Sequence, residues 1–223
     1  MNWTPKSENP TVIAALADYR DFLMRVATLY AGSRLIEQID LSALGNSTKL
    51  AISNDFTDGM TTIRTVEQLS HSIHSGEYGQ LALGQGVIQL CTAFEILFDR
   101  LADAYLISVT SVDAFDANHH SVGGTIKLGN KTLMQVRKLH HLLAVNSAIN
   151  SDEVLIKLAS IIEARNCLTH SGGIVATEKA KTRLWAYRIA STVGQPLILN
   201  NNHLDDFLHY MAINTMAFIN NAP

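Results

Sequence analysis

Two long stretches of this 223-residue chain place an apolar residue at alternating intervals of four and three positions. The first stretch has Val12, Leu16, Tyr19, Leu23, Val26 and Tyr30, and the second has Val87, Cys91, Phe94, Phe98, Leu101 and Tyr105. Residues at this spacing share one side of an α-helix, so each stretch predicts a long helix with one face in a core. The chain must therefore fold around contacts between long helices.

Shorter apolar patterns and end signals predict the other helices. Asn9-Pro10 starts the first helix as N-cap and first helical residue. Asn150, with Glu153 three positions later, has the form of a capping box, and Gly172-Gly173 ends the helix that follows it. We expect helices over residues 10–30 and beyond, about 80–106, about 131–145, about 150–171 and about 203–220.

Two segments have the character of strands. One is Lys49–Ser53, which lies between turn signals. The other is residues 174–199, where apolar runs flank the turn Gly194-Gln195-Pro196 and predict a β-hairpin. We therefore expect one all-α domain over residues 1–223, a bundle of four to five long helices with a small strand-bearing insertion before the last helix.

The composition limits the class of protein. Hydrophobic residues make up 47% and charged residues only 17%, below the usual quarter, so we expect another subunit to cover part of the surface. Cys91 and Cys167 cannot build a disulfide framework. No window approaches 18 uninterrupted apolar residues, and Met1–Lys6 contains no apolar signal segment. We expect a soluble cytoplasmic protein.

Charge is unevenly distributed along the chain. The net charge of −3 argues against a general nucleic-acid coat protein, which would be basic overall. Residues 1–126 carry 7 basic and 14 acidic side chains, whereas residues 127–188 carry 10 basic and 4 acidic ones. This basic third is either a phosphate-facing surface or an internal complement to the acidic helices, and charge alone leaves both open.

One polar cluster lies at the end of the apolar helix inside the basic third. Arg165 and His170 are five positions apart, about 140° around a helix, so they do not share a face. Asn166 and His170 are four apart and do share one. Asn166 is thus placed to orient the His170 ring, while Arg165 either points inward or reaches a site shared with a second copy.

The run Glu163-Ala164-Arg165-Asn166-Cys167-Leu168-Thr169-His170, followed by Gly172-Gly173, resembles the Arg-x4-His signature of the HEPN superfamily. The commonest version of that signature has Asn directly after Arg, as here. The detailed resemblance covers only these residues, and the rest is agreement in helical layout. It implies an all-helical bundle of about four or five helices with the motif near the end of a late helix.

The resemblance also implies a function. Many HEPN proteins are metal-independent endoribonucleases that act as homodimers, with both motifs lining one cleft. His170 would be the catalytic histidine, Arg165 the phosphate-binding residue and Asn166 the orienting group, with Glu163 and Glu95 as supporting acids. RNA supplies its own nucleophile, the 2′-OH, which an imidazole can activate without a metal, while a guanidinium stabilises the phosphate charge. The products would be a 2′,3′-cyclic phosphate and a 5′-OH.

Such proteins are often toxins or phage-defence effectors that a partner, such as a nucleotidyltransferase-like antitoxin, holds in check. The resemblance therefore implies RNA, a second copy and a regulatory protein as partners. It implies no metal and no other cofactor.

Other interpretations remain open. Some HEPN proteins have lost catalysis, so the chain could be an inactive dimeric module that binds nucleotide, RNA or a partner protein. The motif could also be only a helix end, with His170 bonded to terminal carbonyls and Arg165 paired with Glu95 or Asp99. A hydrolase of another kind is a third interpretation, but the sequence contains no nucleophile–base motif that matches one.

The remaining histidines give weaker signals. His71 and His74, His119-His120 and His140-His141 lack the Cys, Asp or Glu spacing of a zinc site. Arg137, Lys138, His140 and His141 lie together on the third predicted helix, where they either extend an RNA-binding surface or are ordinary helix residues.

Overall fold

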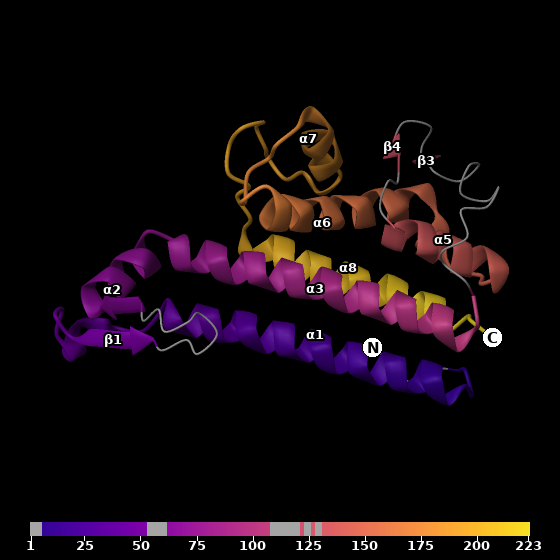
Figure 1. Ribbon diagram of the computed structural model, residues 1–223, viewed down its shortest axis with the longest axis horizontal. Helices are drawn as coiled ribbons and strands as arrows, with labels where there is room; N and C mark the ends of the chain where they lie inside the picture. The colour runs from indigo at the N-terminus through magenta and orange to yellow at the C-terminus, as the bar shows by residue number, and fades with distance from the viewer. Residues whose placement is uncertain (1–5, 53–61, 108–120, 123–125, 128–130) are drawn as a thin grey trace.

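The apolar stripe that begins at Val12 forms the helix α1 (Pro10–Ile36), which starts where the sequence predicts. Asn9 is its N-cap, and the Asn9 side chain accepts a hydrogen bond from the Thr11 backbone N–H over 2.9 Å. The computed structural model describes residues 6–52, 62–107, 121–122, 126–127 and 131–223. Within these ranges most residues are helical, so the all-α class is confirmed (Figure 1).

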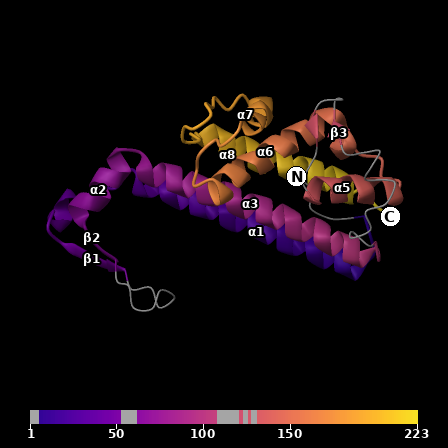
Figure 2. The same ribbon diagram turned by 45° about the horizontal axis from the view of Figure 1, so that its top comes forward.

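The second predicted stripe forms α3 (Glu77–Ala104), which lies beside α1 along most of its length (Figures 1 and 2). Each stripe is buried in the contact between these helices and the rest of the bundle, apart from Tyr30 and Tyr105, which are half-buried. α3 is long and apolar enough to cross a membrane, but 56% of its most apolar window is buried inside the molecule. That burial is typical of the core helix of a folded domain.

A small subdomain joins the far ends of α1 and α3. It contains the 3₁₀ helix η1 (Leu41–Leu44), the strands β1 (Lys49–Ile52) and β2 (Thr62–Thr65), and the helix α2 (Val66–His74). β1 and β2 pair antiparallel, which confirms the short strand predicted from Lys49; Ser53 lies outside the described residues. The helix α2, whose capping box joins Thr65 and Gln68, was not predicted, because its apolar residues Val66, Leu69 and Ile73 span only two turns.

The second half of the chain packs against α3. Its elements are the strands β3 (Ser121–Val122) and β4 (Ile126–Lys127), and the helices α5 (Lys131–Leu142), η2 (Ala148–Asn150), α6 (Asp152–His170) and α8 (Asn201–Ile219). Three phenylalanine rings pack together in this core. The ring centroids of Phe94 and Phe98 are 4.7 Å apart, and those of Phe98 and Phe218 are 5.4 Å apart. Both pairs have the tilted or edge geometry that aromatic rings prefer.

The start of α6 differs from the prediction. Ser151, not Asn150, is the N-cap, and its hydroxyl accepts from the Val154 backbone N–H over 3.4 Å. The Asn150 side chain instead accepts from Arg137 Nε over 3.2 Å. Gly172 and Gly173 have φ values of 60° and 80° and end the helix as predicted, because glycine adopts the left-handed region without strain.

The predicted β-hairpin at residues 174–199 is wrong. The segment forms the helix α7 (Glu178–Leu184) and the 3₁₀ helix η3 (Trp185–Tyr187), and a single bridge between Ile174 and Pro196 ties its ends. Thr177 starts α7 by accepting from the Ala180 backbone N–H over 3.1 Å. The apolar run from Leu184 resembles a strand, but short apolar runs fit strand and helix equally well.

An ion pair fastens α7 to α6. Arg183 Nη1 lies 2.8 Å from Glu163 Oε2, and the two side chains are only 12% and 13% exposed. Ser160 adds a buried hydrogen bond from its hydroxyl to the Leu184 carbonyl over 3.2 Å. The segment from α7 to η3 is therefore a fixed part of the α6 face.

Two glycines on α3 offer a matched test of this packing. A Cβ at Gly86 would lie 2.7 Å from Leu204 Cδ2, whereas one at Gly84 would lie 3.4 Å from Leu168 Cδ2. Both substitutions to Ala gain helix propensity, up to about 1 kcal/mol. We expect Gly86→Ala to be less stable than Gly84→Ala by about 1–3 kcal/mol, because buried Leu204 must move. Urea unfolding measures the difference, and equal stability of the two variants would contradict it.

The α6–α7 ion pair yields a second prediction. Glu163→Ala leaves a buried guanidinium without its carboxylate, and we expect it to lower the free energy of unfolding by about 3 kcal/mol. A double-mutant cycle with Arg183→Ala should give a coupling above about 1 kcal/mol. Arg20→Ala, which breaks the exposed Arg20–Asp21 pair, is the control and should change stability by less than about 1 kcal/mol. Additive effects in the cycle would contradict the assignment.

Candidate functional site

The motif predicted from the sequence lies where α6 crosses α3. Leu168 on α6 packs over Gly84 on α3, and Cys91 Sγ lies 3.9 Å from the Ile161 carbonyl oxygen, so the two helices run antiparallel here. Helical side chains lean toward the N-terminus of their own helix. Arg165 and Glu95 consequently lean toward each other across the crossing.

The crossing fixes the Arg165 side chain. Nη2 lies 2.9 Å from Glu95 Oε2, and Nη1 donates to Asn166 Oδ1 over 3.2 Å. Arg165 Nε is buried and has no hydrogen-bond partner among the described residues. The Arg165 and Glu95 side chains are 20% and 27% exposed, so part of the guanidinium still reaches the surface.

This geometry realises one alternative from the sequence analysis, the pairing of Arg165 with an acid on α3. The acid is Glu95. Asp99, the other acid considered, accepts a hydrogen bond from the Gln135 side chain over 3.0 Å.

His170 occupies the last residue of α6 and is exposed. Arg165 is half-buried against α3, so the two residues face different surroundings, as their five-residue spacing predicts. Within the described residues, the His170 ring has no hydrogen bond to Asn166, whose side-chain oxygen is occupied by Arg165. That Asn166 orients His170 therefore stays a prediction.

The two predicted supporting acids have different neighbours. Glu95 contacts Arg165, whereas Glu163 contacts Arg183 on α7. Sequence reasoning missed Arg183 because it placed that residue in a segment predicted as a hairpin. Glu163 therefore holds α6 against α7, and among the described residues it forms no ion pair with Arg165.

The four residues predicted to extend an RNA-binding surface do not share one. Arg137 and Lys138 are buried, and burial lowers the pKa of Arg137. The His140 ring is hydrogen-bonded to the Ser147 carbonyl, with Nε2 3.0 Å from the oxygen, while His141 is exposed. With Arg165 on Glu95 and Arg183 on Glu163, several cations of the basic third face inward, as an internal complement would.

The two cysteines lack the properties of nucleophiles. Burial raises the pKa of Cys91 to about 12. Burial, with a smaller effect from Glu163, raises the pKa of Cys167 to about 11. Both side chains are therefore neutral thiols near pH 7, and the thiolate is the reactive form. Within the described ranges, no three His, Cys, Asp or Glu side chains gather in a way that could hold a metal ion.

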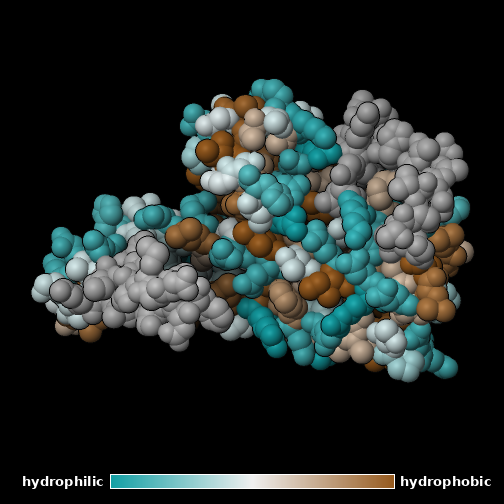
Figure 3. All heavy atoms as spheres, in the orientation of Figure 1, coloured by the Kyte–Doolittle hydropathy of each residue, from teal (hydrophilic) through white to brown (hydrophobic). Residues whose placement is uncertain are grey.

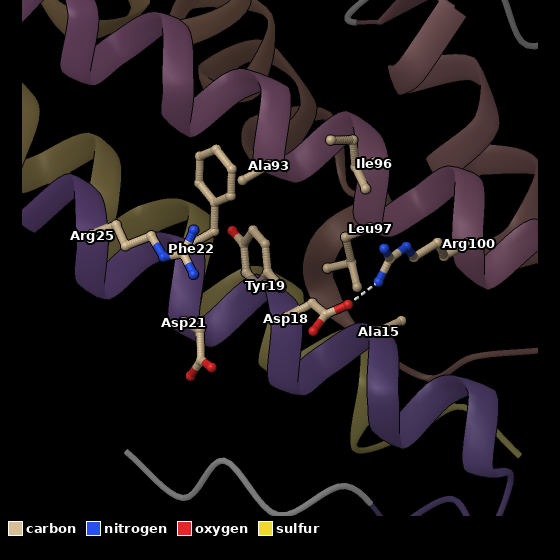
Figure 4. A pocket seen from close by; sticks show the side chains of 10 residues that line it. All are labelled: Ala15, Asp18, Tyr19, Asp21, Phe22, Arg25, Ala93, Ile96, Leu97 and Arg100. Carbon is tan, nitrogen blue, oxygen red and sulfur yellow. Dashed lines mark hydrogen bonds and ion pairs between the residues drawn. The ribbon is translucent and has the colours of Figure 1, made fainter.

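Two of the hollows among the described residues lie beside α1 and beside α7, and neither is lined by Arg165 or His170. One, of about 290 Å³, lies between α1 and α3, where Asp18 and Arg100 form an ion pair and Arg25 lies nearby (Figure 4). The other, of about 600 Å³, lies beside α7 and is lined by Trp185 and Lys181 among others. Neither hollow was predicted from the sequence: the first forms where α1 packs against α3, and the second lies within residues 181–196, a segment predicted as a hairpin.

Comparisons with protein-family models, with curated proteins and with solved structures find no match to this chain. The resemblance of residues 163–173 to the HEPN signature therefore rests on those residues and on their place in the bundle.

Proposed function

We propose that this protein is a metal-independent endoribonuclease of the HEPN type. One observation carries the proposal: the Arg165-Asn166-x3-His170 run closes a late helix of an all-α bundle, with Arg165 held at a helix crossing and His170 exposed. An exposed imidazole and a partly accessible guanidinium, supplied to one site by two copies of the chain, suit cleavage of a phosphodiester that carries its own nucleophile.

The reaction needs a base and an acid. An imidazole removes the proton from the 2′-OH, the 2′-oxygen bonds to phosphorus, and the bond from phosphorus to the 5′-oxygen breaks. The leaving 5′-oxygen takes a proton from a second group, and the products are a 2′,3′-cyclic phosphate and a 5′-OH. Each chain has one such motif, so a homodimer supplies both roles from two copies of His170.

Arg165 would stabilise the negative charge that builds on the phosphate. In the structure its guanidinium contacts Glu95 and Asn166. Phosphate binding must therefore compete with Glu95. The pair is partly exposed, so an RNA phosphate can reach the guanidinium and compete with Glu95 for it.

A second function fits that same pairing. Arg165 bound to Glu95 is what an inactive helical module would show, in which the motif stabilises the bundle and the protein binds nucleotide, RNA or another protein. If the protein is an active ribonuclease, we propose that it is a toxin or phage-defence effector controlled by a regulatory partner. If it is inactive, we propose that it is a binding module.

Cleavage of RNA in EDTA tests the proposal. We expect purified protein to cut mixed tRNA and mRNA without metal and to leave 2′,3′-cyclic phosphate ends. His170→Ala removes the proton-transfer group and should lower the rate by about 10²- to 10⁴-fold. His71→Ala, an exposed histidine in the last turn of α2, is the matched control and should keep the activity.

Cleavage that persists in folded His170→Ala would rule out the assigned role. Sedimentation at the assay concentration accompanies the experiment, because the two-copy mechanism requires a dimer. An active monomer would eliminate the shared site.

Glu95 provides a separate test of the competition for Arg165. Glu95→Gln keeps a hydrogen-bond acceptor but removes the charge, so we expect about 2- to 5-fold tighter RNA binding. Binding is measured in the His170→Ala background to prevent cleavage. Asp99→Asn changes another α3 acid, one bonded to Gln135, and should leave the affinity unchanged. Equal effects of both variants would show only a general change in surface charge.

A further inference from the structure

The hollow beside α7 presents an aromatic ring to solvent. Its lining consists of Lys181, Thr182, Trp185, Ala190, Ser191, Thr192, Gln195 and Pro196. Trp185 is 69% exposed and is the one aromatic residue among the large exposed apolar side chains of the described ranges. A tryptophan buries more apolar area than most side chains when it is covered, so a ligand that fills the hollow and covers this ring would gain that burial.

The exposure of Trp185 is built into the fold. Leu184 before it and Ile189 after it are fully buried. Arg188 has a φ of 54°, and its backbone N–H donates to the Trp185 carbonyl over 2.8 Å, which closes the turn. The Tyr187 ring packs edge-on against Phe207, with centroids 4.9 Å apart. The neighbours of Trp185 are thus fixed in the core while its own ring faces outward.

The opposite wall of the hollow is fastened to the chain that leaves α6. The Val175 backbone N–H donates to the Gln195 carbonyl over 3.0 Å, and the Leu197 N–H donates to the Gly173 carbonyl over 2.7 Å. Gly173 follows His170 by three residues, which span at most about 11 Å of extended chain. One wall of the hollow is therefore tied to the segment that leaves the motif helix, and α7 lies over α6 (Figures 1 and 2).

Most side chains that line the hollow around the Trp185 ring are polar. Thr182, Ser191, Thr192 and Gln195 provide hydroxyl and amide groups that both donate and accept hydrogen bonds. Over α7 the surface mixes hydrophobic and hydrophilic residues, without the continuous apolar face of an obligate protein interface (Figure 3).

One basic side chain, Lys181, lines the hollow beside the ring. Residues 174–199 carry four basic side chains and one acidic side chain, Glu178, and Arg183 is paired with Glu163 of α6. Lys181 pairs with Glu178 over 3.2 Å, but the two side chains are 46% and 75% exposed. So exposed a pair contributes little stability, which leaves Lys181 able to contact a phosphate.

We propose that this hollow binds one nucleobase of an RNA strand, stacked on Trp185, with Lys181 against the neighbouring phosphate. Aromatic side chains are the usual platform for unpaired bases, and hydroxyl and amide groups contact the base edges. That the strand is the substrate of the α6 motif rests on the proposed ribonuclease function; the base site itself does not. Trp185 is then a substrate-positioning residue.

Tryptophan fluorescence tests the stacking directly. The chain has two tryptophans, so Trp3→Phe leaves Trp185 as the only one. The probe is a random-sequence 12-nucleotide RNA with every 2′-OH methylated, which cannot form the cyclic phosphate. We expect saturable quenching of Trp185, and about 5- to 150-fold weaker binding for Trp185→Ala, measured by anisotropy of the labelled probe. Trp185→Phe should retain most of the affinity, and Lys181→Ala should reduce the dependence of binding on salt.

Leu35→Ala, an exposed apolar residue at the far end of α1, is the matched control and should bind as the parent does. Absence of quenching, or unchanged affinity in Trp185→Ala, would overturn the inference. If adenosine monophosphate binds as tightly as the 12-nucleotide RNA, the ligand is a free nucleotide, and the proposal that the hollow binds an RNA strand is wrong. RNA cleavage without quenching would support the ribonuclease function but contradict the proposed base site at Trp185. Quenching with no cleavage of any RNA supports the base site and counts against the ribonuclease.

Discussion

The close crossing of α6 over α3 is the contact on which the candidate site depends. Small residues at Gly84 and Cys91 let the two helices approach, with Leu168 over one and the Ile161 carbonyl beside the other. Because side chains lean toward the start of their own helix, this crossing brings Arg165 to Glu95. The position of the guanidinium is therefore set by core packing and not by a local loop.

Periodicity predicted the part of the fold in which one face of a helix is buried along its length. The stripes of α1 and α3 have this property, and the glycines after His170 mark an end that the backbone requires. The prediction failed at residues 174–199, where α7 and η3 pack against α6 and where Leu184 and Ile189 are buried. A short apolar run of this kind carries no period that distinguishes strand from helix.

The candidate site was predictable to a similar extent. The motif itself and the choice of Glu95 or Asp99 as acid partner follow from the sequence, because helix spacing limits which residues can meet. The burial of Arg137 and Lys138 does not follow from it: a cation on a helix faces inward when its neighbours supply partners, and those partners come from the tertiary fold. Arg183 and Trp185 escaped notice because their segment was assigned the wrong secondary structure.

The pairing of Arg165 with Glu95 and the proposed base site at Trp185 can serve one mechanism. Opening the Arg165–Glu95 pair costs free energy, and stacking a base on an aromatic side chain contributes about 1–3 kcal/mol toward that cost. An RNA strand held at Trp185 would thus offset the displacement of Glu95, while a free phosphate anion would not. The base stacked on Trp185 does not react, but its binding energy would help to place Arg165 on the phosphate that is cleaved. Under this mechanism Glu95 blocks the site against small anions, and the strand that reaches both places is selected.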